Sequence, residues 1–234
     1  MDARDRLIVA LDFPNRQLAE NLVSVLGNSV TTYKVGKQLF TAEGPPIVRE
    51  LVAAGKKVFL DLKFHDIPNT VAGAVSAAAE LGVSMLTVHA SGGAMMLRAA
   101  AEAAASSRSK PLVLAVTVLT SLGDEDLAEI GVAGRAAEQV LRLAKLAQSA
   151  GCGGIVASAN EAAHLRRTLG LGLAIVTPGV RPAGAATGDQ ARVATPRAAI
   201  EAGATYLVVG RPITGALDPA GAAEGILREI EGKP

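Results

Sequence analysis

An aspartate, a lysine and a second aspartate follow closely on one another where an apolar run ends, as Asp61, Lys63 and Asp66. In a β-strand successive side chains point to opposite faces, so Asp61 and Lys63 would share a face, roughly 6–7 Å apart along the strand. Two acids that flank a lysine at the end of a strand favour a catalytic role if this is the active-site end of a barrel. A structural ion pair would use the same residues, and their spacing alone leaves that alternative open.

Two other apolar runs carry ionisable residues near their ends. Asp12 follows the run at 7–11, and Lys34 lies near the end of 31–36. Alone, either residue could be a helix cap or a surface residue. In a barrel of parallel strands, however, the carboxyl ends of all strands meet at the face that carries active sites. We therefore expect Asp12 and Lys34 to converge with the acid–lysine pair on one spot.

A phosphate site is predicted near the end of the chain. Gly210 and Arg211 follow the last apolar run, where a glycine lets the backbone approach a ligand and an arginine can bind two oxygens. The segment 178–194 is rich in Gly, Pro and Ala and contains Arg181 and Gln190. A loop of this length is typically functional or disordered, and its composition also fits a plain surface loop. Loops at these two places commonly bind phosphate in barrel enzymes.

Other polar residues fit more modest roles. Thr120 and Ser121 end the run at 112–119 with hydroxyl groups suited to the edge of a polar ring. The three histidines are too scattered in the sequence to predict a metal site. His89 is expected in the wall of the site, His65 in a structural role and His164 on a helix surface.

Short aliphatic runs alternate with Ala-rich helical patterns along the whole chain, in units of about 29 residues. Strands are predicted at 7–12, 31–36, 57–63, 85–90, 112–119, 153–158, 173–180 and 206–211. Helices are predicted near 14–26, 38–54, 68–80, 92–105, 134–149, 161–169, 195–202 and 218–231.

Strands that alternate with helices require a parallel sheet, because each crossover helix covers one face of it. Eight such units favour an α/β fold of the (β/α)₈ TIM-barrel type, as a single domain over 1–234. The alternative is a doubly wound open sheet. Such a sheet usually opens with a glycine-rich turn, and residues 11–14, Leu-Asp-Phe-Pro, contain no glycine.

The composition narrows the function classes. The 234 residues carry 23 Lys and Arg against 22 Asp and Glu, with no basic run, which argues against a nucleic-acid partner. The first residues have too short an apolar stretch for a signal peptide, and no apolar run is long enough to span a membrane. A single cysteine, Cys152, fits a reducing compartment. We therefore expect a cytoplasmic globular protein that binds neither nucleic acid nor a membrane.

Taken together, these segments resemble the bacterial type of the orotidine 5′-phosphate decarboxylase family. The longest match reads Asp-Leu-Lys-Phe-His-Asp-Ile-Pro-Asn-Thr at 61–70. Asp-x-Lys-x-x-Asp alone would be moderately specific, but the whole set is highly specific and runs in the family's order. The other matching segments lie at 10–12, 33–36, 119–121, 177–182, 188–190 and 209–213.

The resemblance implies a homodimeric carboxy-lyase without a cofactor or metal, which converts orotidine 5′-phosphate to UMP in the last step of de novo pyrimidine biosynthesis. It implies that Lys63 protonates C6 of the pyrimidine beside Asp61, with Lys34 and Asp66 completing an alternating charge array. Further implied contacts are Asp12 and Lys34 with the ribose; Thr120 and Ser121 with the pyrimidine; Arg181, Gln190, Gly210 and Arg211 with the phosphate; and Asp66, Ile67 and Thr70 with the neighbouring subunit's site.

Two alternatives compete with this interpretation. Related barrels with the same Asp-x-Lys-x-x-Asp core act on sugar phosphates through a Mg²⁺-stabilised enediolate, but they place an acidic metal ligand where this chain has Lys34. A lysine there would repel Mg²⁺. The other alternative is a non-catalytic barrel that binds a phosphorylated ligand, which would not need Lys63 between two acids.

Overall fold

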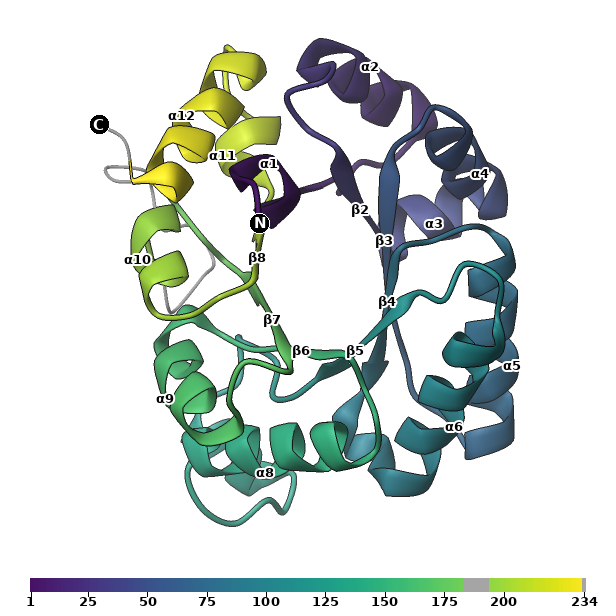
Figure 1. The fold of residues 1–234 in the computed structure, drawn as a ribbon, viewed down its shortest axis with the longest axis vertical. Helices are drawn as coiled ribbons and strands as arrows, with labels where there is room; N and C mark the ends of the chain where they lie inside the picture. Colours follow the sequence, from purple (N-terminus) through teal and green to yellow (C-terminus); the bar gives the residue numbers. More distant parts are fainter. Residues whose placement is uncertain (183–193, 233–234) are drawn as a thin grey trace.

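The structure, a computed structural model, describes residues 1–182 and 194–232. Eight parallel strands close into a barrel in chain order, with β8 paired to β1. Helices surround the strands on the outside (Figure 1). The strands are β1 Leu7–Ala10, β2 Thr32–Gly36, β3 Lys57–Phe64, β4 Met85–His89, β5 Leu112–Val116, β6 Gly154–Val156, β7 Ala174–Pro178 and β8 Tyr206–Val209.

The helices follow the strands in the order expected for a (β/α)₈ barrel, which confirms the predicted fold class. Within the described residues they are α1 Ala3–Arg6, α2 Arg16–Leu26, α3 Lys37–Glu43, α4 Pro45–Ala53, α5 Pro68–Glu80, the 3₁₀ turn η1 Ala90–Gly92, α6 Gly93–Ser106, α7 Asp124–Glu129, α8 Ala136–Ser149, α9 Ala159–Leu169, α10 Pro196–Glu201, α11 Arg211–Thr214 and α12 Pro219–Glu231.

The predicted helix at 38–54 is in fact two helices, α3 and α4. The break falls at Gly44, whose φ of 66° lies in the left-handed region that glycine adopts without a Cβ penalty. Pro45 begins α4, in the first turn, where its missing N–H is not needed. The Gly44 N–H still donates to the carbonyl of Phe40 and so closes the last turn of α3.

The short helices α1, α7 and α11 were not predicted, because four to six residues are too few to show a helical period. The fifth strand was predicted to run to residue 119 but ends at Val116. The ladder continues for one more bond, from the Thr117 N–H to the carbonyl of Val156. The chain then turns into the loop that leads to α7.

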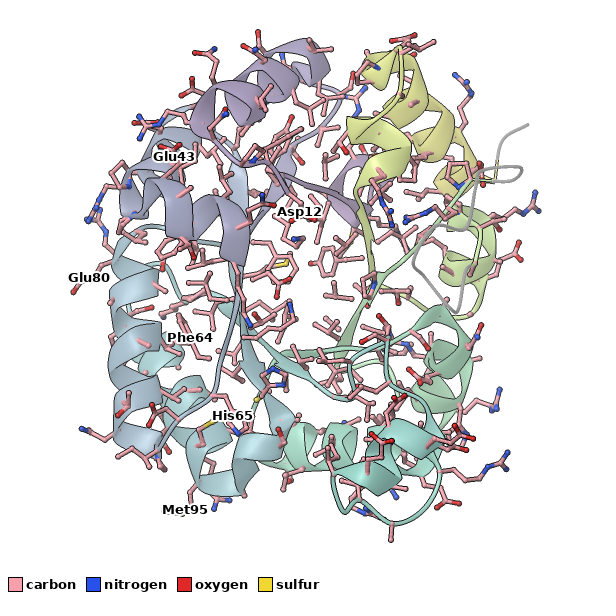
Figure 2. All side chains as sticks on the ribbon, turned by 180° about the vertical axis from the view of Figure 1, so that it is seen from behind. Asp12, Glu43, Phe64, His65, Glu80 and Met95 are labelled. Atoms are coloured by element: carbon pink, nitrogen blue, oxygen red, sulfur yellow. The ribbon has the colours of Figure 1, made fainter. Side chains whose placement is uncertain are left out.

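Two apolar layers hold the barrel together. The larger layer lies between the strands and the surrounding helices. The smaller one fills the barrel interior, and its buried members are Ile8, Ala10, Phe59, Met85, Leu114, Val176 and Val208. Seen from the opposite end, Asp12 lies within the ring of elements whereas Met95, on α6, lies at its edge (Figure 2). In the part of the chain that the structure describes, no helix is long and apolar enough to cross a membrane.

Candidate active site

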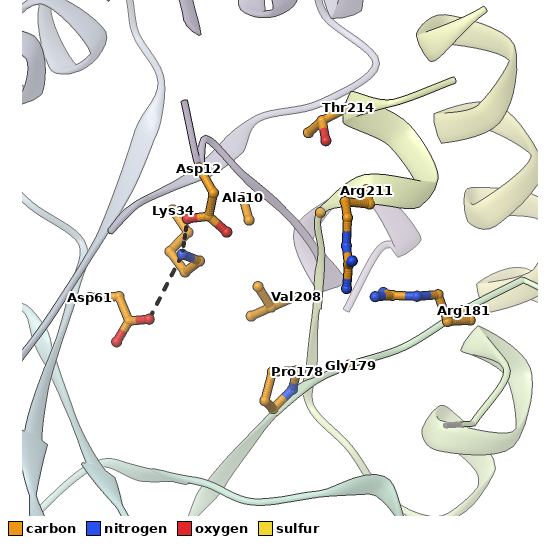
Figure 3. Close-up of a pocket in the computed structure, with 11 residues that line it drawn as sticks. Ala10, Asp12, Lys34, Asp61, Pro178, Gly179, Arg181, Val208, Arg211 and Thr214 are labelled. Carbon is orange, nitrogen blue, oxygen red and sulfur yellow. Dashed lines mark hydrogen bonds and ion pairs between the residues drawn. The ribbon is translucent and has the colours of Figure 1, made fainter. Parts of the chain in front are cut away.

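Two adjoining pockets open at the carboxyl ends of the strands, where a barrel positions its active site. Lys34 and Asp61 line both of them, so the pockets form one continuous site. The larger pocket, of about 400 Å³, is lined by Ala10, Asp12, Lys34, Asp61, Pro178, Gly179, Arg181, Val208, Gly210, Arg211 and Thr214 (Figure 3). The smaller, of about 170 Å³, is lined by Lys34, Phe59, Asp61, Lys63, Val116, Val118, Leu119, Thr120, Val156, Val176, Pro178 and Val208.

Four charged side chains from β2, β3 and the end of β1 form a chain across this site, as predicted. The Lys34 Nζ lies 2.8 Å from Oδ1 of Asp12 and 3.9 Å from Oδ2 of Asp61 (Figure 3). On its other side, Oδ1 of Asp61 lies 2.8 Å from the Nζ of Lys63. Signs therefore alternate from Asp12 to Lys63, and each inner member has an opposite charge on both sides. The Lys34 and Asp61 side chains are only 11% and 15% exposed, and a largely buried charge needs such oppositely charged partners.

A glycine lies against the first pair of this chain. Gly36 ends β2, and a Cβ placed on it would lie 3.0 Å from both the Asp12 carboxylate and the Lys34 ammonium. That separation is shorter than ordinary van der Waals contact. The absence of a side chain at Gly36 therefore lets the ion pair lie against the backbone.

The third strand is not a regular strand where it carries the catalytic candidates. In its pairing with β4, Leu60 is opposite Leu86 and Phe64 is opposite Val88, so four steps along β3 match two along β4. Within this bulge Lys63 has a φ of 56°, in the left-handed region that non-glycine residues rarely adopt. The sequence pattern correctly placed Asp61 and Lys63 on one side of the strand, but it did not predict the bulge.

Two arginines converge at the far side of the larger pocket. The Arg181 and Arg211 side chains point toward one another from β7's following segment and from α11 (Figure 3). Burial lowers the pKa of Arg181, and the positive charge of Arg211 lowers it further. Only 7% of Arg181 is exposed, whereas Arg211 is exposed, so one guanidinium lies inside the pocket and the other at its open side. Such a pair is suited to an anion with several oxygens, such as phosphate.

The base of the predicted phosphate loop is held by the backbone. Val180 and Ala194 form an isolated parallel bridge, and the Arg181 N–H donates to the carbonyl of Ala194 at 3.0 Å. The guanidinium of Arg181 also donates to the carbonyl of Val180. These bonds fix where the loop leaves and rejoins the barrel. Gln190, a predicted phosphate ligand, lies outside the described residues.

The smaller pocket combines the Lys63 ammonium with an apolar wall. Valines from β5, β6, β7 and β8 line it together with Phe59, and Thr120 supplies a hydroxyl at its edge. This mixture suits a flat ring with polar edges. Thr120 was predicted for this role, whereas Ser121 is not among the described residues that line either pocket.

His89 ends β4 beside the charged chain, and its ring centroid lies 5.4 Å from that of His65. Burial lowers the pKa of His89, and the charges of His65, Lys63 and Lys37 lower it further, against the opposing effect of the Asp61 carboxylate. The cationic form of His89 is therefore disfavoured in the folded chain. His164 is exposed on α9, as predicted.

Three predicted residues lie apart from the pockets of their own chain. Asp66, Ile67 and Thr70 are exposed on the loop after β3 and the first turn of α5, and the Asp66 carboxylate accepts a hydrogen bond from the Ile67 N–H. Their predicted contact with a neighbouring subunit stays a prediction. Several pocket residues were not predicted, among them Thr214 and Gly179, because glycine and threonine also occur at many places in the chain that line neither pocket.

Comparisons with known proteins match one family over most of the chain. Residues 5–226 match the model of the "Orotidine 5'-phosphate decarboxylase / HUMPS family". A protein of Halorhodospira halophila named orotidine 5′-phosphate decarboxylase is 59% identical over 225 residues, which cover 96% of this chain and 95% of that protein. One of the same name from Idiomarina loihiensis is 55% identical, over 97% of this chain and 99% of that protein. The crystal structure of orotidine 5′-phosphate decarboxylase from Lactobacillus acidophilus superimposes with a TM-score of 0.86 at 42% identity, covering 96% of this chain and 98% of that one.

Proposed function

The chain belongs to the orotidine 5′-phosphate decarboxylase family and is a carboxy-lyase, and from this premise we propose that its alternating charge chain performs the decarboxylation. The overall reaction converts orotidine 5′-phosphate to UMP and CO₂, a step of pyrimidine biosynthesis. The observation that carries the proposal is the Asp12–Lys34–Asp61–Lys63 chain, which ends in an ammonium at the apolar pocket.

The chemistry assigned to Lys63 follows from the intermediate. When the bond between C6 and the carboxylate breaks, CO₂ leaves and the electron pair stays on C6. No adjacent carbonyl can delocalise that pair as an enolate, so the negative charge is localised. An ammonium over C6 stabilises this charge as it develops and then gives its proton to C6. Lys63 is left neutral and recovers a proton from solvent, and the cycle uses no cofactor.

Asp61 has two roles in this proposal. Its hydrogen bond from the Nζ of Lys63 holds the ammonium in place before the reaction. It also stands beside the substrate carboxylate, where repulsion between two anions would favour loss of CO₂. Lys34, between Asp61 and Asp12, offsets part of the negative charge and would bind a ribose hydroxyl together with Asp12.

The remaining contacts orient the substrate along the site. The phosphate lies between Arg181 and Arg211 with Gly210 and Gln190, and the pyrimidine ring enters the smaller pocket near Thr120 and Ser121. Binding energy gained at the phosphate, far from C6, can be used to hold the reacting end of the substrate in position. The groups that bind the phosphate and the ring are thus distinct from Lys63, which transfers the proton.

We further propose that the active form is a homodimer in which Asp66, Ile67 and Thr70 enter the partner's site. Their exposure in the single chain supports this arrangement, since Ile67 is a large apolar residue that is 67% exposed. Mixing a Lys63→Ala chain with an Asp66→Ala chain tests it, because a mixed dimer contains one site with both residues intact. About a quarter of the sites would then regain activity for a two-fold symmetric dimer. No recovery upon demonstrated subunit exchange would contradict the shared site.

The central experiment follows the loss of orotidine 5′-phosphate absorbance by purified protein with EDTA present. We expect turnover by the wild type and a loss of about 10²–10⁴-fold or more in Lys63→Ala. Lys57→Ala is the matched control: it removes a lysine from the same strand, at the opposite end, where Lys57 pairs with Asp5 on the surface. Retained turnover in Lys63→Ala would refute the role of Lys63. An inactive but folded wild type that acts on sugar phosphates with Mg²⁺ would favour the metal-dependent alternative.

A further inference from the structure

A threonine outside the pocket linings connects the two catalytic candidates of β3. Thr87 lies in the middle of β4 and is fully buried. Its hydroxyl oxygen accepts a hydrogen bond from the backbone N–H of Lys63 at 2.9 Å. The same hydroxyl donates to Oδ1 of Asp61 at 3.0 Å.

The direction of both hydrogen bonds is fixed by the chemistry of the partners. A backbone N–H can only donate, and an ionised carboxylate can only accept. The single proton of the Thr87 hydroxyl must therefore point at Asp61, while a lone pair of the oxygen faces Lys63. Oδ1 of Asp61 receives this proton and also the Nζ of Lys63. Thr87, Asp61 and Lys63 thus form a closed ring of three hydrogen bonds.

This ring of hydrogen bonds lies at the irregular part of β3. The bulge between Leu60 and Phe64 removes the regular ladder partner of the Lys63 N–H, and a buried N–H without a partner is unfavourable. The left-handed backbone of Lys63 is itself a strained conformation, which persists only where the surroundings hold it. The Thr87 hydroxyl supplies the missing acceptor at this point. A valine of the same shape could not do so.

We infer that Thr87 is a positioning residue, which through its hydroxyl holds the Lys63 backbone and the Asp61 carboxylate so that the ammonium faces the reacting carbon. The inference rests on the proposed role of Lys63. Thr87 does not line either pocket, so it acts through these two residues and not on the substrate. Substrate binding by the distant arginines should be largely independent of it.

Two substitutions at Thr87 separate the hydroxyl from the volume of the side chain. Thr87→Val keeps the shape and removes both hydrogen bonds, and Thr87→Ser keeps the hydroxyl. We expect Thr87→Val to lower kcat by about ten- to one-hundred-fold with little change in KM, because a small displacement of a catalytic group has effects of this size. Thr87→Ser should stay within about threefold of the wild type, since serine offers the same donor and acceptor.

Thr117→Val is the matched control. Thr117 is also a buried barrel threonine, and its hydroxyl donates to the carbonyl of Val156 at 2.9 Å. It lies between two pocket-lining valines without lining a pocket itself. This variant should lower the melting temperature and leave kcat unchanged. The positioning role of the hydroxyl would be refuted if Thr117→Val lowered kcat as much as Thr87→Val does. It would also be refuted if Thr87→Ser lowered kcat as much as Thr87→Val does.

A second measurement does not depend on catalysis. Amide hydrogen exchange at Lys63, followed by NMR, should be at least about tenfold faster in Thr87→Val than in the wild type or in Thr87→Ser. Equal protection in all three proteins would overturn the inference. A different outcome is an inactive wild type in which the Lys63 amide is protected in the wild type and in Thr87→Ser, but not in Thr87→Val. That outcome would refute the proposed function and leave the positioning role of Thr87 standing.

Discussion

The ammonium of Lys34 lies 2.8 Å from the carboxylate of Asp12, and both groups lie 3.0 Å from the place where a Cβ on residue 36 would stand. No side chain at Gly36 therefore separates the ion pair from the backbone at the end of β2. Since Lys34 also faces Asp61, the position of this one ammonium would affect both the proposed ribose contacts and the proposed proton donor, Lys63.

We expect Gly36→Ala to displace this ion pair and to lower kcat/KM by about tenfold or more, because the new methyl group would overlap both partners. The fold should tolerate the change, since the φ of Gly36 is −93° and suits any residue. Steady-state kinetics and thermal unfolding measure the two effects separately. Gly225→Ala, inside α12 with only Arg228 near its Cβ, is the control and should leave activity unchanged. Unaltered kinetics in Gly36→Ala would show that the pair can shift without consequence.

Removal of the Arg211 guanidinium should impair turnover although it touches no reacting atom. We expect Arg211→Ala to lower kcat/KM by about 10²-fold or more, since hydrogen bonds to a charged group contribute roughly 1.5–3 kcal/mol each. The comparison is with Arg142→Ala, on the exposed surface of α8, where Arg142 pairs only with Gln139 among the described contacts. Kinetics with orotidine 5′-phosphate measure the effect. A kcat/KM near that of the wild type would show that phosphate binding is not coupled to catalysis through Arg211.

The residues of this site differ in how well the sequence predicts them. Asp61 and Lys63 could be predicted because ionisable side chains on an apolar strand demand a reason, and Lys34 and Asp12 followed from the same rule at neighbouring strands. The rule depends only on period-two alternation and on the common direction of the strands. The alternation and the common direction are both kept where a strand is locally irregular.

The bulge at Lys63 could not be predicted in this way. A left-handed backbone at a lysine has no local signal, since it is imposed by the pairing of β3 with β4 and by the Thr87 hydroxyl. The one available hint was a threonine within the otherwise aliphatic run Met85–Val88, and threonine is common in ordinary strands. The break between α3 and α4 was different, because Gly44 and Pro45 do mark it in the sequence.

A separate prediction concerns stability. The Arg166 guanidinium on α9 donates to the carbonyls of Gly203, Gly170 and Leu173 and to the hydroxyl of Thr205, at distances from 2.8 to 3.2 Å. It joins the end of α9 to the segments that lead into β7 and β8. Arg166→Met would leave several of these acceptors without a partner, and we expect it to lower the free energy of unfolding by about 2–4 kcal/mol.

Urea unfolding measures this loss, and kcat/KM should change little because Arg166 lies away from both pockets. The neighbouring residue provides the control: Arg167 is exposed, so Arg167→Met should stay within about 0.5 kcal/mol of the wild type. Equal stability of the two variants would mean that water replaces the guanidinium at no cost.

His89 is expected to make the stability of the fold depend on pH. Burial and the nearby charges of His65, Lys63 and Lys37 lower the pKa of His89 in the folded chain, so the unfolded chain takes up the proton first as the pH falls. Stability is therefore retained above the ordinary histidine pKa of about 6.5 and decreases as the pH falls from there toward the lower pKa of the folded state. One proton can contribute at most about 1.4 kcal/mol per pH unit to this slope.

Urea unfolding at pH 7.5 and pH 5.5 tests this linkage. We expect His89→Gln to reduce the loss of stability between the two pH values, because glutamine cannot take up the proton. His164→Gln, on the exposed face of α9, should keep the wild-type difference. If His89→Gln lost as much stability on acidification as the wild type, another group would have to account for the pH dependence. A larger loss in His89→Gln would mean that the sign is reversed and that the folded chain prefers His89 charged.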